Sequence, residues 1–332
     1  MIRKFTAGVL FCLAVLPLSF CKSAKAQSVK VGFPSISVEF VPLFAAKDKG
    51  LFKKYGLDVD DIVMQGGTQV VQALIGGSLD FAVMGGAFLG GAVKGADLVM
   101  VATHMDRFPY SLVVKPDIKK VEDLKNKKLG ISGFGSTSHA ALQLSLERVG
   151  LNPKKDVVIL QIGGQSARFA ALKAGSIDGT IVISPFTVAA QRLGFNVLFN
   201  MAKLGIPYPQ EGVVASRQYI FKHRQTVLNF LKGFLEAIRD IKVNKEFAIS
   251  VMAKHLKMDP KKDRDALEDA YQDIVVEQII KNPQPNLNAI KAALELMNVN
   301  NDMKASMDPK QYVDASLMEE LEKSGFLSSV YK

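Results

Sequence analysis

The sequence predicts an α/β fold in which two similar domains are each built on a mostly parallel sheet and are followed by a helical segment. From residue 27 onward, short runs rich in β-branched and aromatic residues alternate with helical stretches. One strand–turn–helix–strand unit occurs twice, and the chain from about residue 222 reads as successive helices. Strands buried on both faces read as apolar runs, and their alternation with helices is typical of parallel sheets.

The first 26 residues differ from the rest of the 332-residue chain. Two basic residues precede residues 7–20, which are almost continuously apolar. That run is too short to cross a hydrocarbon core of about 30 Å at about 1.5 Å per residue. The pattern predicts an export signal peptide that is cleaved after Ala26. Lipoprotein anchoring at Cys21 is the less favoured alternative, because the preceding Phe20 is bulky.

The net charge of +10 and the two cysteines are unevenly placed along the chain. The predicted leader holds four basic residues and no acid, so the remaining chain carries +6. Cys12 and Cys21 also lie in the leader, which leaves the remaining chain without a disulfide, a thiolate metal site or a cysteine nucleophile. The remaining charges are mixed in sign along the helices, so no nucleic-acid partner is expected.

The expected strands form two sets, which are separated near residue 110. They are residues 29–33, 57–63, 81–84 and 98–102, then 111–114, 129–132, 157–162, 180–183 and 197–199. Helices are expected between them at residues 38–55, 68–75 and 138–149. Helices punctuated by prolines are expected in the last third at residues 225–243, 245–256, 261–276, 288–297 and 314–323.

An internal similarity supports two domains of like architecture. Residues 66–80 and residues 163–178 each run from a Gly pair through Ala-Leu and Gly-Ser to an Asp. In both copies the final Gly of the helix, Gly77 or Gly175, suits the left-handed position after a helix. Chance similarity of two short units is the alternative, but the order of five shared features favours a repeat.

Small and polar residues collect where strands lead into helices. In open α/β sheets ligands bind at the carboxyl ends of strands, and helix N-termini there suit an anion. Each loop alone is typical of an ordinary turn, whereas their recurrence in both halves favours a binding site. The loops are residues 34–37, 65–68, 85–88, 133–139, 163–166 and 184–186.

Signatures of catalysis are missing. The sequence has no P-loop, dinucleotide fingerprint, nucleophile elbow or His-Glu-x-x-His, and its four histidines have no metal-ligand spacing. His104, near Asp106, is expected to have a turn or core role. For His139, at the start of a helix, ligand contact and packing remain equally open. Arg168 is expected to face solvent rather than to neutralise an anion.

Residues 42–59, which read PLFAAKDKGLFKKYGLDV, carry the most specific resemblance to a known family. The runs 66–80 and 171–178, Ser184-Pro185, and the Ser/Thr-rich turn with His at residues 136–139 add to it. On these motifs the chain resembles the ABC-transporter solute-binding proteins of the sulfonate, taurine and nitrate group, which is often classed with the thiamine-pyrimidine synthase family. The similarity runs from about residue 29 to about residue 218.

This resemblance implies a two-lobed type II periplasmic-binding-protein fold with a two-strand hinge, crossed near residues 110–112 and 211–214. The implied division is a signal peptide (1–26), the first part of lobe 1 (27–110), lobe 2 (111–212), and the completion of lobe 1 with the C-terminal helices (213–332). No Arg or Trp stands where sulfonate binders often place a ligand-contacting group. The implied ligand-binding residues are Ser35, Ser37, Phe40, Gly67, Thr68, Gly85 and Gly86 from lobe 1, and Ser136, Thr137, Ser138, His139, Gln165 and Ser184 from lobe 2.

The function that this resemblance implies is an exported, periplasmic receptor and not an enzyme. The receptor would capture a small anionic solute (sulfonate, nitrate or carboxylate-like) between closing lobes and deliver it to an ABC permease in the inner membrane. No cofactor or metal is expected, and the protein is expected to be a monomer. The alternatives are a binder of a pyrimidine or thiamine precursor, a pyrimidine-synthase-like enzyme on the same fold, and a sensor module. The enzyme is disfavoured because that synthase family relies on a cysteine-rich motif.

Overall fold

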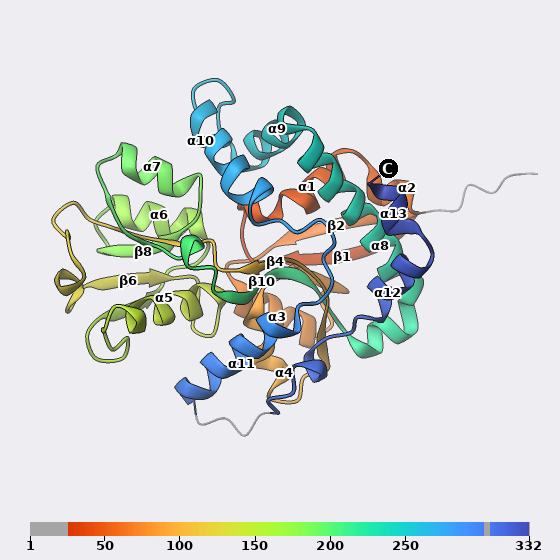
Figure 1. Cartoon of the computed structure of the whole chain (residues 1–332), viewed down its shortest axis with the longest axis horizontal. Coiled ribbons are helices and arrows are strands. Elements are labelled where there is room, and N and C mark those ends of the chain that lie inside the picture. The colour runs from red at the N-terminus through yellow and green to blue at the C-terminus, as the bar shows by residue number, and fades with distance from the viewer. Residues whose placement is uncertain (1–25, 302–305, 332) are drawn as a thin grey trace, which may run out of the picture.

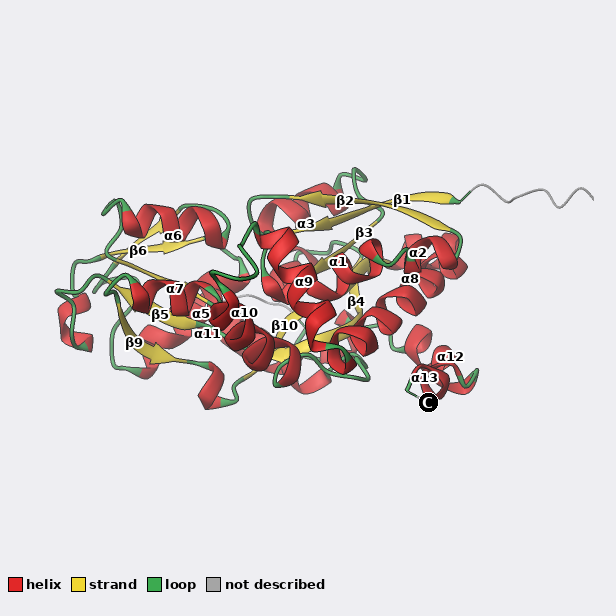
Figure 2. Cartoon of the chain, turned by 90° about the horizontal axis from the view of Figure 1, so that it is seen from above, coloured by secondary structure: helices red, strands yellow, loops and turns green. Residues whose placement is uncertain are grey.

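The strands of the protein form two separate five-stranded sheets, as the computed structural model shows for residues 26–301 and 306–331 (Figure 1). The two sheets follow one another along the longest axis, and helices cover both faces of each (Figures 1 and 2). The predicted α/β class with two mostly parallel sheets is therefore confirmed. The predicted leader, including Cys21, lies outside the described residues except for Ala26.

The first sheet has the strand order β2-β1-β3-β10-β4. Parallel pairing joins β1 to β2 and β3, whereas β10 runs antiparallel to both β3 and β4. In Figure 1, α1 (Val41–Asp48) lies above this sheet and α3 (Gly67–Ile75) below it. The strand bounds are β1 (Gln27–Phe33), β2 (Leu57–Val63), β3 (Phe81–Met84), β4 (Leu98–Arg107) and β10 (Pro207–Ser216).

The second sheet repeats this pattern in the order β7-β6-β8-β5-β9. Parallel pairing joins β6 to β7 and β8, and β5 is the antiparallel strand between β8 and β9. Its helices are α5 (Thr137–Arg148) on one face and α6 (Gln165–Lys173) and α7 (Phe186–Arg192) on the other. The strand bounds are β5 (Ser111–Val114), β6 (Lys128–Ile131), β7 (Val158–Gln161), β8 (Gly179–Val182) and β9 (Asn196–Asn200).

Equivalent hydrogen bonds show that the sequence repeat is a structural repeat. Asp80 Oδ2 accepts from the backbone N–H of Lys30 at 2.7 Å, and Asp178 Oδ2 accepts from that of Lys128 at 2.8 Å. Asp80, just before β3, is thus tied to β1, and Asp178, just before β8, is tied to β6 in the same way. Gly77 and Gly175 adopt φ of +70° and +74°, in the left-handed region that the sequence predicted.

Two segments connect the sheets: residues 108–110 lead from β4 to β5, and residues 201–206 lead from β9 to β10. Residues 211–214, near which the sequence predicts the second crossing, belong to β10 of the first sheet, where Val213 pairs with Val83 and Ala102. The strand β10 was missing from the predicted strands, since two prolines and Gly212 interrupt its apolar pattern. Long-range pairing with two neighbours stabilises it despite this weak local preference.

The C-terminal helices pack on the first sheet and its helices. The longest, α8 (Arg217–Val243), contacts α1 and α2 (Leu51–Lys54), and it buries Phe230 and Phe234 completely. A second, α11 (Leu287–Asn301), contacts β10. No described helix is long and apolar enough to cross a membrane. The remaining helices are α4 (Leu89–Ala92), α9 (Lys245–Leu256), α10 (Arg264–Ala270), α12 (Ser316–Lys323) and α13 (Phe326–Val330).

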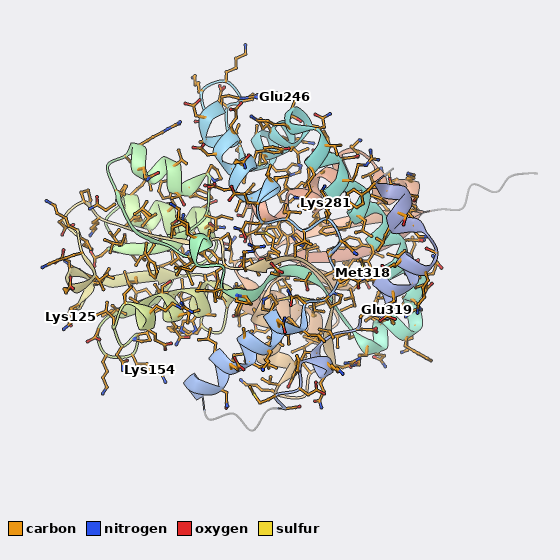
Figure 3. All side chains as sticks on the ribbon, in the orientation of Figure 1. Lys125, Lys154, Glu246, Lys281, Met318 and Glu319 are labelled. Atoms are coloured by element: carbon orange, nitrogen blue, oxygen red, sulfur yellow. The ribbon has the colours of Figure 1, made fainter. Side chains whose placement is uncertain are left out.

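The outer surface carries charges of both signs. Figure 3 places Lys125 and Glu246 at the periphery of the molecule, and Lys281 and Glu319 are exposed as well. Several such groups form exposed ion pairs, for example Arg264 with Glu246 at 2.5 Å. The mixture agrees with the solvated helical surface that the sequence predicts.

Candidate functional site

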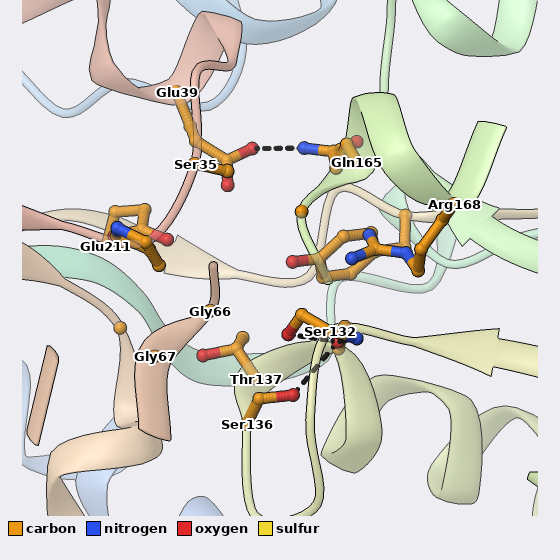
Figure 4. A pocket seen from close by; sticks show the side chains of 15 residues that line it. Ser35, Glu39, Gly66, Gly67, Ser132, Ser136, Thr137, Gln165, Arg168 and Glu211 are labelled. Carbon is orange, nitrogen blue, oxygen red and sulfur yellow. Dashed lines mark hydrogen bonds between the residues drawn. The ribbon is translucent and has the colours of Figure 1, made fainter. Parts of the chain in front are cut away.

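A cavity of about 30 Å³ lies between the two sheets, where loops after β1, β2, β3, β6 and β7 converge (Figure 4). Both halves of the molecule contribute to its wall, because the carboxyl ends of the parallel strands in each sheet face it. The volume is enough for only a few water molecules. The lining residues are Pro34, Ser35, Glu39, Gly66, Gly67, Gly85, Tyr110, Ser132, Ser136, Thr137, Ser138, Gly164, Gln165, Arg168 and Glu211.

Three helices begin at this cavity, namely α3, α5 and α6. Gly66 and Gly163 open the first and last of these turns with φ of +121° and +113°, where a side chain would be strained. The first N–H groups of a helix have no partner within it, and they lie at the positive end of the helix dipole. This part of the wall therefore suits an anionic group.

The serine-rich turn before α5 is held by its own hydrogen bonds. Ser138 Oγ accepts from the N–H of Ser132 at 2.9 Å, and Ser136 Oγ caps the helix by accepting from the N–H of His139 at 3.2 Å. Within the described part of the chain, no residue hydrogen-bonds Thr137 Oγ1, although Thr137 lines the cavity. The turn thus leaves the Thr137 hydroxyl available to a ligand.

Gln165 connects the two halves across the cavity. Its Nε2 donates to Ser37 Oγ at 2.7 Å, and its Oε1 accepts from the N–H of Ile183 at 3.0 Å. A second direct contact joins Thr68 Oγ1, as donor, to the carbonyl of Phe134 at 3.0 Å. These bonds link residues around the first sheet to residues around the second, so the structure is a closed arrangement of the two halves.

A pair of buried carboxyl groups occupies the wall on the side of the first sheet. Glu39 is 3% exposed and Glu211 2%, and the two carboxyl groups are close enough to influence each other electrostatically. Burial raises the pKa of Glu39 to about 7. Burial, and then the neighbouring Glu39, hold the pKa of Glu211 well above its usual range. Glu211 Oε2 is buried and has no hydrogen-bond partner among the described residues, although buried polar atoms are ordinarily paired.

Arg168 is buried, which corrects the expectation that it faces solvent. It is 2% exposed and lines the cavity, because this face of α6 turns toward the sheet. Its Nε, Nη1 and Nη2 donate to Thr180 Oγ1, the Gly163 carbonyl and the Ile181 carbonyl at 3.2, 2.8 and 3.1 Å. Burial lowers the pKa of its guanidinium, which nevertheless stays charged. An arginine therefore does stand at the cavity, and its charge acts on Glu39.

His104 is a core residue, as the sequence predicted. It is fully buried, and its Nε2 lies 3.1 Å from the Glu39 carbonyl, to which it donates. Burial lowers the pKa of His104 to about 4, so the ring is neutral at physiological pH. Its hydrogen bond helps to hold the backbone of Glu39 in place. Among the described residues no group of three or more His, Cys, Asp or Glu side chains could hold a metal ion.

The structure brings most of the sequence-predicted site residues together. Those that line the cavity are Ser35, Gly67, Gly85, Ser136, Thr137, Ser138 and Gln165. Ser37 contacts Gln165 of this set, and Thr68 contacts the carbonyl of Phe134, two residues before Ser136. Four lie elsewhere: Phe40 is fully buried in the core, Gly86 and His139 border a second cavity of about 730 Å³, and Ser184 donates to Asp273 Oδ2 at 2.7 Å.

Several lining residues were not among the individually named ligand-binding residues. Pro34, Gly66 and Gly164 lie in the polar loops that the sequence indicates as a site, whereas Glu39, Tyr110, Ser132, Arg168 and Glu211 lie outside those predictions. One signal was present in the sequence, since Glu39 and Glu211 are single acids within stretches that are otherwise apolar or small. A charged residue rarely sits in such a stretch unless it is paired.

Comparisons with known proteins agree with this architecture. The chain is 26% identical over 275 residues to a Brucella abortus protein that is named as a candidate binding protein. The alignment covers 80% of this chain and 84% of that one. It is 29% identical over 203 residues to the taurine-binding periplasmic protein of Escherichia coli, covering 58% and 60%. The solved alkanesulfonate-binding protein of Xanthomonas axonopodis, bound to MOPS, has the same fold, with a TM-score of 0.71, 21% identity and coverage of 89% and 99%.

A family model gives the assignment, because it spans more than half of the chain. The model described as NMT1/THI5 like matches residues 37–247, which include Glu39, Gln165, Arg168 and Glu211. The two sheets, the cavity between them and this match agree with one another. The chain therefore belongs to the NMT1/THI5-like family.

Proposed function

We propose that this protein is an exported receptor that captures a small solute bearing an anionic group and passes it to an ABC permease. The observation that carries this proposal is the cavity between the sheets, whose wall combines three helix N-termini with the free hydroxyl of Thr137. Relatives named as taurine-binding and nitrate/nitrite-binding proteins support an anionic group on the solute.

The two halves are proposed to act as closing lobes. Lobe 1 comprises residues 27–110 together with 213–332, and lobe 2 comprises residues 111–212, with the residues near the last boundary shared through β10. The open form would bind the solute through one lobe, and closure would add the donors of the other and exclude water. A solute shifts this equilibrium only by its higher affinity for the closed form.

Export is part of the same proposal. Residues 1–26 would be removed as a signal peptide after Ala26, and the receptor would act in the periplasm, where the names of relatives place them. Lipid anchoring at Cys21 is the alternative form of the exported protein. The receptor is proposed to work as a monomer, docked on its permease.

We propose binding rather than catalysis, although one structural neighbour with 13% identity and a TM-score of 0.64 is the desulfurization enzyme DSZB. No imidazole or amine among the described residues lines the cavity beside Thr137 and the serines. General acid–base chemistry there would depend on the acid pair and Tyr110, and Glu39 lies opposite the turn that holds Ser136 and Thr137.

The test is a thermal-shift screen of the exported protein against small sulfonates, carboxylates and nitrate, followed by calorimetry of each hit. A ligand that binds the native state raises the melting temperature. Thr137→Val, which removes one hydroxyl, should weaken binding of a hit about tenfold and leave the ligand-free melting temperature nearly unchanged. Ser166→Ala, at an exposed position of α6, is the matched control. Equal affinities of the Thr137 variant and the wild type would exclude the hydroxyl from the site.

A further inference from the structure

We propose that the Glu39–Glu211 pair recognises a cationic group, so that the receptor selects a zwitterion whose ammonium faces this pair and whose anionic end faces the N-termini of α3 and α5. The inference rests on the proposed function and specifies the solute of the same cavity. It begins from the charges in the wall. Arg168 contributes one positive charge. The acid pair contributes one negative charge when Glu39 ionises beside Arg168, because burial and then the charge of Glu39 favour the neutral form of Glu211. The side chains of the wall therefore carry no net charge of their own.

The net charge of the occupied cavity differs between a bound zwitterion and a bound monoanion. A zwitterion adds no net charge, and it places charges of both signs next to partners of opposite sign. A simple monoanion would leave a net negative charge in a buried site, unless the acid pair takes up a second proton. Buried charge without compensation is costly, so the wall as built favours the zwitterion.

The geometry supplies the two ends that a zwitterion needs. In Figure 4, Glu39 lies at the top of the cavity, and Ser136 and Thr137 lie at the bottom. Glu39 Oε2 already accepts from Ser37 Oγ at 3.2 Å and from Gln165 Nε2 at 3.3 Å, so its carboxylate is fixed in orientation. The carboxyl oxygens of the pair other than Glu39 Oε2 remain as acceptors for an ammonium group.

The groups packed around the pair come from several elements. Arg168 on α6 favours the charged form of Glu39, whereas Tyr110 and Tyr208 are neutral because burial and the nearby acids raise the pKa of each phenol. His104 on β4 is neutral and bonds the Glu39 backbone. The acid pair is thus the one anionic group that these elements present to the cavity.

The experiment compares matched probes that differ only in the amino group: taurine with ethanesulfonate, β-alanine with propionate, and γ-aminobutyrate with butyrate. Calorimetry in buffers of different ionisation enthalpy gives the affinity and the number of protons exchanged near pH 8, where Glu39, with a pKa of about 7, is mostly ionised. We expect at least one amino compound to bind about tenfold or more tightly than its partner, with close to zero protons exchanged. Weaker binding of a partner should be accompanied by uptake of about one proton.

Variants make the test specific to the pair. Replacing both acids, as Glu39→Gln with Glu211→Gln, should reverse the preference, so that the compound lacking the amino group binds more tightly. Glu211→Gln alone replaces a neutral carboxyl group and keeps the Glu39 carboxylate beside Arg168, so it should retain the preference for the zwitterion. Glu39→Gln alone removes that carboxylate and should lose the preference, and the comparison of these two single variants gives the answer if the double variant does not fold.

The outcomes distinguish the inference from the function on which it rests. Equal or tighter binding of the compounds without an amino group would overturn the zwitterion and leave the anion receptor in place. Failure of every amino and non-amino probe to bind would overturn the proposed receptor for small solutes with an anionic group.

Discussion

Gln165 and Ser37, which belong to different halves of the molecule, are joined by a 2.7 Å hydrogen bond across the cavity. The same Gln165 amide is anchored by the N–H of Ile183 at 3.0 Å, so its orientation is fixed before it reaches Ser37. Closure is therefore coupled to a rigid donor rather than to a freely rotating side chain.

Gln165→Ala should favour the open form and weaken solute binding. The variant loses the bond to Ser37 and leaves a buried hydroxyl without its donor, which costs about 1–2 kcal/mol, or roughly tenfold or more in affinity. Small-angle X-ray scattering with saturating ligand should show a larger radius of gyration than the wild type. Gln191→Ala, at an exposed position of α7, is the control, and an unchanged radius and affinity in Gln165→Ala would contradict this role.

Arg168→Met should destabilise the fold, because the acid pair loses its buried counter-charge. Removing one partner of a buried charged set costs about 3 kcal/mol or more, measured as the free energy of unfolding in urea. Adding Glu39→Gln and Glu211→Gln should recover part of that loss, since the uncompensated negative charge is gone. If the triple variant is no more stable than Arg168→Met, the guanidinium acts by packing and by its carbonyl bonds alone.

The acid pair should make the protein less stable as the pH rises from about 6.5 to 8. The pKa of Glu39 is raised from 4.5 to about 7, so the folded state binds more protons than the unfolded state in this window. Stability from a raised carboxyl pKa is present at low pH and is lost as the pH passes the folded pKa, with a slope of at most about 1.4 kcal/mol per pH unit for one proton.

This pH window avoids two opposing groups. His104, with a folded pKa of about 4, increases stability as the pH rises toward its unfolded value of 6.5. Lys242, with a folded pKa of about 8, does so above that pH. Urea unfolding at several pH values should therefore show a flatter profile for Glu39→Gln than for the wild type. A substitution of the exposed Glu122 by Gln is the control, and parallel profiles for all three proteins would contradict the assignment.

Gly85→Ala should hinder closure and destabilise lobe 1. A methyl group there would lie 2.8 Å from Thr137 Oγ1 of the other half and would also press on the Gln210 carbonyl. We expect a lower melting temperature and ligand affinity reduced by about tenfold or more. Gly90→Ala, where an added methyl group meets nothing within 4 Å, should change neither property. Similar behaviour of the two variants would show that the two halves do not approach this closely in solution.

The fold was largely predictable from local signals. Three strands, residues 57–63, 81–84 and 111–114, match the predicted bounds. The last two are apolar runs, whereas residues 57–63 mix Leu, Val and Ile with three aspartates and end before Gly66 and Gly67. The helix predicted at residues 38–55 divides near Gly50, whose φ of +68° lies in the left-handed region. What local signals missed was β10, which depends on pairing with strands that are more than a hundred residues away in sequence.

The site was only partly predictable. Polar loops such as residues 136–138 follow several of the predicted strands, and their recurrence in both halves of the sequence indicates a binding site. Arg168 and Glu211 depend instead on which helix face or strand face turns toward the cavity, and a long charged side chain is ordinarily at the surface. Their partnership with Glu39 arises only when residues 39, 168 and 211 meet in three dimensions.

The buried set of Glu39, Arg168 and Glu211 also has an evolutionary consequence. Neither Glu39 nor Arg168 can change alone without leaving an unbalanced charge in the interior, so divergence at these two positions should proceed by linked replacements. Relatives that have a neutral residue in place of Arg168 are expected to lack one of the two acids as well. The receptor could therefore acquire a new solute class in a single coordinated step, with the rest of the cleft retained.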